Sequence, residues 1–368
     1  MTHICTANLP SVISWRSGVV TTVRRRWGSA VEVAVEVGGE SLPAIAYVDL
    51  VGEPVVGDRA LLNVSALTLR LGTGGHALVV ALPDRLPPDV PRPGHVVKAR
   101  YTPGQVTVLS VDEEDSPHRS LLVDADDLGG MPVVTADLHS ALLPIVAALR
   151  AEAPGIRVAY VMTDSAALPL AYSRTVAALA SAGWLAGTVT CGQAYGGDLE
   201  APTVHMGLLA ARHVLGADAA VVCQGPGNLG TGARWGFSGV SVGEAVNAVS
   251  ILGGHPVAAL RISGADERPR HQGVSHHSLT AYGRVALRAA DVVVPVLSGP
   301  FGELVGEQVA PLSPPHWLVT VAADDLLPAL DAAPLAATTM GRTVGDDPAY
   351  FLANLAAGRH AATVVALR

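Results

Sequence analysis

A glycine-rich loop after a short apolar run offers the first candidate for chemistry. The run Ala219–Cys223 ends at Gln224. Three glycines follow with the spacing G-x-G-x-x-G, at Gly225, Gly227 and Gly230. Glycines let the backbone turn sharply and let a ligand approach its N–H groups, which attract anions at the start of a helix. The candidate ligand-binding residues of this loop are Gln224, Gly225, Gly227, Asn228, Gly230, Thr231 and Gly232.

Two other interpretations of this loop stay open. The glycines can equally form tight packing turns without a ligand. A dinucleotide fingerprint would need an acidic residue about twenty positions further on, which is missing. It would also need a helix that begins sooner than the one expected near Ser241. The sequence therefore favours phosphate or carboxylate binding over a nicotinamide dinucleotide.

Two arginines and three histidines fall within the ten residues 268–277. Arginine offers paired donors to phosphate or carboxylate, and histidine can bind a metal or transfer protons. Adjacent histidines on an extended segment point apart, so we expect His276 and His277 not to share an ion. Anion binding is the favoured interpretation, a solvated loop with one histidine capping a helix comes second, and a metal site with His271, His276 and a distant carboxylate third. The candidates are Arg268, Arg270 and Ser275 for ligand binding, and His271 and His276 for catalysis.

Carboxylates follow two of the predicted strands. Asp198 and Glu200 could chelate a cation or divide into an acid and a base. They could instead stabilise the start of a helix predicted from Ala201. Asp164 is either a catalytic residue or a helix N-cap. We take Asp164 and Asp198 as candidate catalytic residues and Gln193 as a candidate ligand-binding residue.

These candidates follow strands of an expected parallel sheet. After Gly130, short Val-rich runs alternate with Ala- and Leu-rich segments of helical length, which is typical of a parallel sheet covered on both faces. In such sheets ligands bind outside the carboxyl ends of the strands. We predict a Rossmann-like, doubly wound, mostly parallel sheet, with a closed (β/α) barrel as the alternative. The predicted strands are 131–135, 157–163, 185–190, 219–223, 256–262, 291–297, 317–321 and 363–367, and the predicted helices include 141–151, 167–180, 201–214 and 279–289.

The first part of the chain has a different pattern. Between residues 12 and 123, apolar residues alternate with polar ones in short runs cut by turns, which predicts a small antiparallel β barrel or sandwich. The predicted domains are residues 1–120, the β domain, and 121–368, the α/β domain. The predicted strands are 18–23, 31–37, 44–47, 60–64, 77–81, 95–100 and 106–111.

Composition limits the class of protein. The chain has 368 residues, a net charge of −8, 49% hydrophobic and 15% charged residues. The negative charge argues against nucleic acid or a membrane surface as partner, and Arg24–Arg26 is best explained as a solvated strand end. Three cysteines, Cys5, Cys191 and Cys223, are too few for a disulfide framework, and we expect the last two to be buried. With no signal peptide or spanning segment detected, we expect a cytoplasmic protein, and a homo-oligomer stays open.

Several strings resemble an uncharacterised bacterial family known only as a domain of unknown function. The resemblance covers most of the chain and implies one complete protein, but it implies no activity, cofactor or catalytic residue. The strings are Gly57–Asn63, Arg100–Gln105, Leu138–Ser140, Thr190–Ala201, Arg270–His277 and Thr339–Arg342.

The leading functional hypothesis is an enzyme that acts on a small anionic, phosphorylated or nucleotide-like molecule. The alternatives are a non-catalytic ligand sensor or scaffold, with the β domain as docking module, and a metal-dependent hydrolase. The sequence identifies no cofactor.

Overall fold

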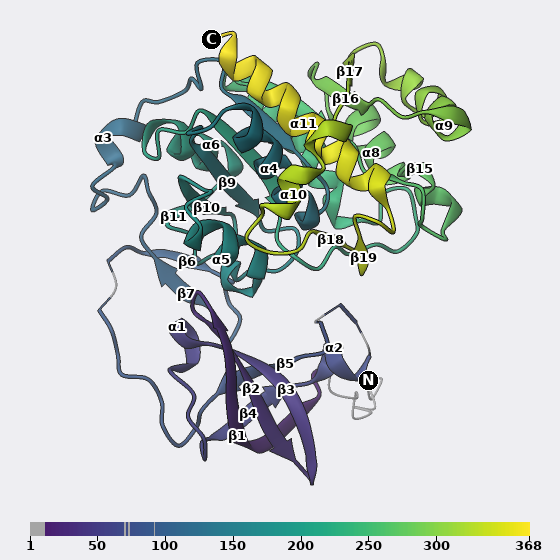
Figure 1. The fold of residues 1–368 in the computed structure, drawn as a ribbon. Helices are drawn as coiled ribbons and strands as arrows, with labels where there is room; N and C mark the ends of the chain where they lie inside the picture. The colour runs from purple at the N-terminus through teal and green to yellow at the C-terminus, as the bar shows by residue number, and fades with distance from the viewer. Residues whose placement is uncertain (1–11, 70, 73, 92) are drawn as a thin grey trace, which may run out of the picture. The chain divides into compact units, whose positions relative to one another are not determined.

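Two compact units make up the chain, residues 1–91 and 92–368 (Figure 1). The computed structural model describes residues 12–69, 71–72, 74–91 and 93–368, and Cys5 lies outside them. The predicted domain boundary near residue 120 is a statement about which part of the chain folds on its own. It stays a prediction.

The first unit is a closed five-stranded barrel, as predicted. Its strand order is β1-β2-β3-β5-β4, with β3 and β5 parallel and the other neighbours antiparallel. Five-stranded Greek-key barrels of the OB type have this arrangement. Valines and alanines of all five strands fill the interior. The elements are β1 (Trp15–Trp27), β2 (Ala30–Val37), β3 (Glu40–Tyr47), α1 (Val48–Val51), β4 (Arg59–Asn63), α2 (Ser65–Thr68) and β5 (Ala77–Ala81).

Ion pairs account for the basic run at the end of β1. Arg24 and Arg25 pair with the buried carboxylate of Glu32, and Arg26 pairs with Glu53. Burial raises the pKa of Glu32, but the arginines and His76 lower it by more. Each of the three arginines thus has a carboxylate partner within the barrel, and Arg24 and Arg25 share theirs.

The second unit is built on an eight-stranded, all-parallel sheet. The open sheet is confirmed, and the alternative of a closed (β/α) barrel is wrong. The central strands are almost wholly buried, because helices cover both faces. In order across the sheet the strands are β11 (Leu199–Ala201), β10 (Gly187–Cys191), β9 (Val158–Thr163), β12 (Ala219–Gln224), β8 (Pro132–Thr135), β13 (His255–Ala259), β16 (Asp291–Pro295) and β17 (Trp317–Val321).

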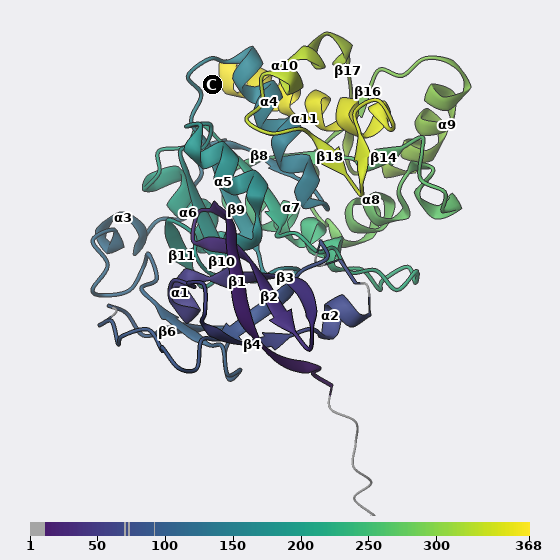
Figure 2. The same cartoon turned by 60° about the horizontal axis from the view of Figure 1, so that its bottom comes forward.

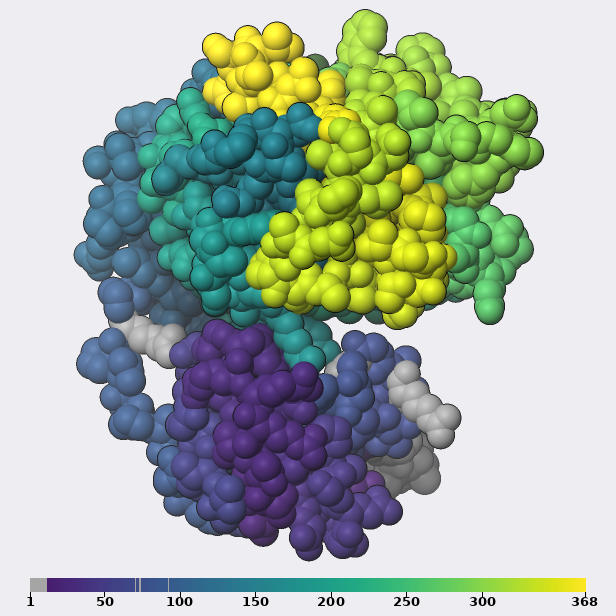
Figure 3. All heavy atoms as spheres, viewed as in Figure 1, coloured from purple at the N-terminus to yellow at the C-terminus, as the bar shows by residue number. Residues whose placement is uncertain are grey.

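The helices divide between the two faces of this sheet. Helices α4 and α11 lie side by side on one face (Figures 1 and 2). In Figure 3 the yellow-green and yellow segment from α10 onward forms much of the visible face of this unit. One face carries α4 (Leu142–Glu152), α5 (Arg174–Ser181), α10 (Pro328–Asp331) and α11 (Pro348–Ala366), and the other α3 (Arg119–Leu122), α6 (Val204–His213) and α7 (Ser241–Ile251).

Short elements complete the second unit. Helices α8 (His276–Thr280) and α9 (Gly299–Val309) belong to a core cluster beside β13 and β16. Three two-stranded pairs are β6 (Val96–Lys98) with β7 (Val106–Val108), β14 (Ile262–Ser263) with β15 (Gly273–Val274), and β18 (Thr338–Thr339) with β19 (Arg342–Thr343).

The order of the strands reverses at β8. The chain leaves β8 to form β9, β10 and β11 on one side, returns to place β12 next to β8, and continues to β13 on the other side. In open α/β sheets ligands bind at the carboxyl ends of the strands beside such a point. The ends of β8 and β12 are therefore the expected location of a site.

Several predicted elements differ from the structure. The helix predicted over 167–180 begins only at Arg174, and the one predicted over 279–289 is the short helix α8 followed by a π-helical turn at Ala281–Val285. Residues 363–367 were expected to form a strand, but residues 348–366 form the single long helix α11. The β-branched residues at its end follow a buried, Ala-rich helical face, whose packing overrides their strand preference. The helix predicted from Ala201 begins only at Val204, where Thr203 is the N-cap, because residues 199–201 form the edge strand β11.

Lys98, the only lysine in the sequence, ends strand β6 and is fully buried in the second unit. Its Nζ donates to the carbonyl oxygens of Thr190 and Ala194, at 2.8 and 2.7 Å, and to Glu200 Oε2 at 2.7 Å. Glu200 Oε1 also accepts from the N–H of Gly196. Glu200 is thus a structural partner of Lys98 and not a helix-start residue.

Both described cysteines are buried and free, as expected. Strand β9 lies between the strands that carry Cys191 and Cys223, so the two are not neighbours. Burial raises the pKa of each thiol to about 12, which keeps it protonated. Among the described residues, no helix is both long and apolar enough to cross a membrane.

A carboxylate at the amino edge of the sheet gives a prediction about pH. His255 Nε2 and His360 Nε2 each lie 2.7 Å from Asp291 Oδ2. Burial raises the pKa of Asp291, but the hydrogen bonds from the two histidines lower it by more, to well below its usual range. A lowered carboxylate pKa stabilises the fold above the unfolded-state value of about 3.9, and this contribution is lost as the pH falls.

We therefore expect Asp291→Asn to lower the free energy of unfolding at about pH 7 and to matter less at about pH 3. Urea unfolding of both proteins at the two pH values measures the difference. An equal loss at both pH values would contradict this assignment.

Candidate functional site

Polar side chains meet at the carboxyl ends of β8, β12 and β13. Asp137 follows β8, Gln224 ends β12, and Arg261 follows β13. Gln224 Nε2 donates to the carbonyl oxygen of Asp137 at 2.7 Å, and Arg261 Nη1 lies 3.9 Å from Asp137 Oδ2. All three side chains are at least 95% buried. They form the floor of a site at the point where the strand order reverses.

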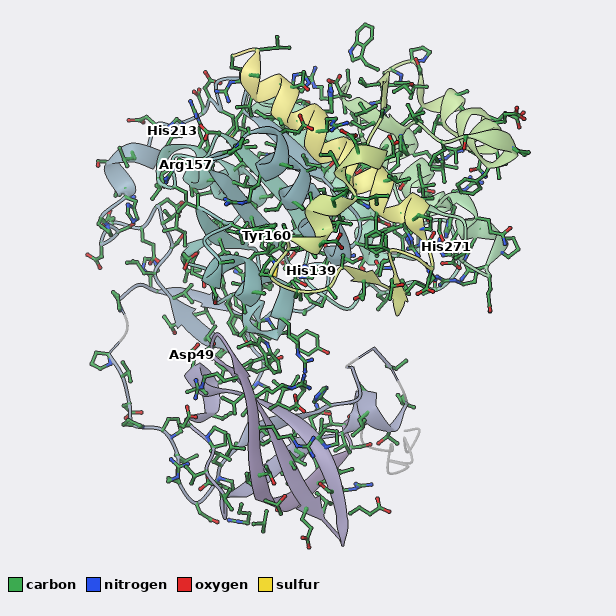
Figure 4. All side chains as sticks on the ribbon, viewed as in Figure 1. Asp49, His139, Arg157, Tyr160, His213 and His271 are labelled. Carbon is green, nitrogen blue, oxygen red and sulfur yellow. The ribbon has the colours of Figure 1, made fainter. Side chains whose placement is uncertain are left out.

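Figure 4 shows the two edges of this sheet. His139 and His271, which follow strands of the sheet, lie toward the lower side of the second unit, and Tyr160, in the middle of β9, lies near His139. Arg157, which precedes β9, and His213, which ends α6, lie toward the opposite side.

Three histidines come together beside this floor. One ring nitrogen from each of His271, His276 and His277 lies within 4.8 Å of the other two. The expectation that His276 and His277 point apart is wrong, because the two form the first turn of helix α8 and do not lie on an extended segment. Ser275, and not a histidine, is the N-cap of that helix and accepts from the N–H of His277.

Neighbouring groups hold the histidine rings in place. His271 Nδ1 lies 2.7 Å from Ser275 Oγ, and the ring of His277 stacks on Phe237 with centroids 3.9 Å apart. His277 Nδ1 lies 3.5 Å from Asp137 Oδ2 and 3.4 Å from Arg261 Nη1. Burial, followed by the charges of Arg261 and Arg268, lowers the pKa of His271 to about 3. Burial and His277 lower the pKa of His276 to about 4, so both rings are neutral at about pH 7.

Unpartnered polar atoms gather at this edge. Within the described residues, six buried side-chain nitrogen or oxygen atoms lack a hydrogen-bond partner. Five of the six belong to residues at or beyond the carboxyl ends of four neighbouring strands or to helix α8. Buried polar atoms without partners are costly and rare in folded proteins. The five are Asp137 Oδ2, Thr163 Oγ1, Gln224 Oε1, Arg261 Nη2 and His276 Nε2.

The glycine-rich loop lies against the histidine segment. A Cβ added to Gly230 would lie 3.9 Å from Nε2 of His277, and one added to Gly232 would lie 3.9 Å from the guanidinium of Arg270. The loop is a small hairpin in which Thr231 N donates to the carbonyl oxygen of Gly236 at 2.7 Å. Helix α7 begins only at Ser241, so the loop does not run directly into a helix.

Other members of the loop have structural roles. Asn228 Oδ1 accepts from Gln224 Nε2 and from Ser238 Oγ, and thereby ties the loop to the end of β12. Gly225 lies so close to Ala167 that a Cβ would approach its carbonyl oxygen to 2.7 Å. Gly227 has a φ of +97°, which only glycine adopts readily.

The two predicted arginines differ in their surroundings. Arg268 donates to both oxygens of Asp266, at 2.8 and 2.7 Å, and these bonds lower the pKa of Asp266 to far below its usual range. Arg270 is exposed beside Gly232. Arg270 is therefore the better placed of the two to contact a ligand over the loop.

Three predicted residues are engaged elsewhere. Asp164 accepts from the N–H of Gln193 at 2.8 Å, and the Gln193 side chain accepts from the N–H of Arg100. Asp198 precedes β11 and accepts from the N–H and hydroxyl of Thr188, toward the amino end of β10. The structure thus separates Asp198 from the histidine cluster.

A second polar group lies beside β9. His139 Nδ1 is 3.2 Å from the hydroxyl of Tyr160, and His139 Nε2 is 2.6 Å from Ser173 Oγ. Burial lowers the pKa of His139 to about 4. Because both ring nitrogens have partners, this histidine positions loops and does not present a free nitrogen.

A cavity of about 460 Å³ lies elsewhere in the second unit, lined by His95, Ser110, Asp112, Glu113 and Arg119, among others. Glu113 accepts from the N–H groups of His95 and Ser110, and Arg119 donates to the carbonyl oxygen of Asp112. Since these groups satisfy one another, we place the candidate site at the histidine cluster.

Sequence reasoning missed several residues of the site. Arg261 lies inside the predicted strand 256–262, Asp266 follows that strand, and Phe237 follows the glycine loop. Asp137 follows a predicted strand but was not selected. A charged residue at the end of an apolar run, as at Arg261, is the signal that could have found it.

Fold and site together define an α/β protein with a histidine- and arginine-containing cluster at the carboxyl edge of a parallel sheet. The chain belongs to the family described as protein of unknown function (DUF3866), which matches residues 43–358. The resemblance to a family of unknown function is thereby confirmed. No curated protein and no solved structure matches the chain.

Proposed function

We propose that this protein is an enzyme that acts on a small anionic molecule, phosphorylated or nucleotide-like, bound over the carboxyl ends of β9, β12, β8 and β13. The observation that carries the proposal is the group of five unpartnered buried polar atoms at this edge. A ligand that supplies both donors and acceptors would satisfy them.

Charge favours an anion as that ligand. Arg261 Nη2 is buried and has no hydrogen-bond partner among the described residues, although Asp266 Oδ2 lies 3.6 Å away, and the exposed Arg270 lies beside Gly232. Guanidinium groups bind phosphate and carboxylate through paired donors. Three imidazoles and the Asp137 carboxylate supply groups that can accept and donate protons, which favours an enzyme over a passive binder.

The proposal predicts that phosphate, sulfate or a nucleotide raises the melting temperature of the protein. A ligand at about a hundred times its Kd adds about 2.7 kcal/mol to the free energy of unfolding. Arg270→Ala should remove most of that gain, because it deletes an exposed guanidinium at the site without disturbing a buried pair. A thermal-shift assay over these anions, followed by assays for turnover of each anion that binds, measures both properties.

Arg288→Ala is the matched control, since Arg288 is also exposed but lies before β16. This variant should keep the full response. If no anion shifts the wild type, or if both variants respond alike, the proposal fails. Binding without turnover of any of these anions would favour the ligand-sensing alternative.

A further inference from the structure

We propose that His271, His276 and His277 hold a divalent transition-metal ion of the zinc class at the proposed site. This inference rests on the proposed function, because it names the group that would bind the anion beside Arg270. The donor set is three imidazoles, which suits zinc, copper, iron and nickel.

The distances among the three rings fit one ion. Zinc–nitrogen bonds of about 2.0–2.1 Å at tetrahedral angles place ligand nitrogens about 3.3 Å apart. In the structure one nitrogen from each ring already lies within 4.8 Å of the others. Small side-chain rotations therefore suffice to bring the three onto one centre.

Each ring has a nitrogen to offer. Ser275 Oγ engages Nδ1 of His271, and Asp137 Oδ2 lies 3.5 Å from Nδ1 of His277. Metal-binding histidines usually donate their second ring N–H to a hydroxyl, carbonyl or carboxylate, which fixes the ring and its tautomer. With Nδ1 protonated, Nε2 of His271 is free to bind an ion. Nδ1 of His277 faces both Asp137 Oδ2 and Arg261 Nη1, at 3.5 and 3.4 Å, and Nε2 of this ring is available for an ion when the Nδ1 proton is directed to the carboxylate. His276 Nε2 is buried and without a partner among the described residues.

The surrounding charges are balanced. Arg268 is paired with Asp266, and Arg261 lies 3.6 Å from Asp266 and 3.9 Å from Asp137. Arg261 and Arg268 therefore face a cation with carboxylates beside them, and the charge of Arg270 near His276 is one that an anion bound at the site would balance. Three protein ligands leave a fourth position open, as in catalytic zinc sites, where an anionic oxygen can bind.

The second histidine group of the described structure is explained without an ion. His255 and His360 both hydrogen-bond the same oxygen of Asp291, at 2.7 Å each. These two rings have a partner in the fold, whereas His276 Nε2 has none among the described residues. The two groups lie at opposite edges of the sheet, so variants can tell them apart.

The test strips the full-length protein with a chelator and titrates it with Zn²⁺ or Co²⁺ alone. We expect roughly one ion per chain, with visible absorption bands of Co²⁺ bound to nitrogen. His271→Ala and His276→Ala should abolish binding. His205→Ala, an exposed histidine on helix α6, and His360→Ala should leave it unchanged.

A variant outside the three ligands tests whether a loss of metal binding comes from lost coordination or from misfolding. Asp137→Asn keeps the shape of the side chain but removes the charge facing His277 Nδ1, and should weaken metal affinity by about 10–100-fold. Failure of the wild type to bind either ion would overturn the inference, and so would loss of binding in His360→Ala with retention in His276→Ala.

Stabilisation by phosphate is measured separately, on protein kept in chelator and on protein loaded with metal. If no metal binds but phosphate still stabilises the wild type through Arg270, the metal inference fails and the proposed function stands. If the metal binds through these histidines but no anion does, with or without it, the proposed function fails and the metal site stands.

Discussion

Replacing Lys98 with methionine is expected to lower the free energy of unfolding of the second unit by about 3–5 kcal/mol. Lys98 Nζ has three acceptors, two carbonyl oxygens and Glu200 Oε2, and its side chain is fully buried. Methionine has a similar length but no charge, so Glu200 would remain as a buried carboxylate without its cation. Urea unfolding followed by the helical circular dichroism signal measures the loss.

Two controls accompany this variant. Arg100→Met changes an exposed cation of the same segment and should alter the free energy of unfolding by no more than about 0.5 kcal/mol. Lys98→Met combined with Glu200→Gln should regain part of the loss, because it removes the unpaired charge. A loss below about 1 kcal/mol in the single variant would contradict the buried ion pair.

Replacing Phe351 with alanine is expected to cost about 3–5 kcal/mol of unfolding free energy. Phe351 lies on helix α11, is fully buried, and belongs to the largest core cluster. Its ring meets that of Tyr350 edge-on, with centroids 5.4 Å apart. Removal of the ring loses this contact and leaves a cavity between α11 and the sheet.

Leu352→Ala is the neighbouring control. Leu352 is only half-buried on the same helix, so the variant should cost clearly less than Phe351→Ala. Equal losses would mean that α11 does not present its Phe351 face to the core. Thermal and urea unfolding of the two variants and the wild type provide the comparison.

The sequence predicts strands correctly where a run of apolar residues is buried along its whole length. Between Arg157 and Thr163 the predicted run 157–163 consists of apolar residues and Tyr160, and it becomes strand β9, buried on both faces. The run Thr363–Val364–Val365 has the same local character but ends a long helix, because the residues before it pack a helical face onto the core. Strand β11 escaped prediction because three residues at the sheet edge leave too short a pattern.

The candidate site was predictable in part. The glycine loop and the histidine segment were each recognised by composition, and Gly230 does lie against His277. The pairing of Asp137 with Arg261 was not, because 124 positions separate two residues that only the sheet order brings together. Asp198 was selected from its sequence neighbours, but the short crossover from β10 to β11 carries it to the other edge.

The burial of Lys98 also has a consequence for chemical labelling. A protein with a single lysine, wholly enclosed, offers amine-selective reagents no side chain while that segment stays folded. Modification of Lys98 then requires the chain around β6 to open, at a rate set by the free energy of that local opening. Mass spectrometry of the fraction of acylated protein over time would thus measure how often this one segment opens, without any engineered probe.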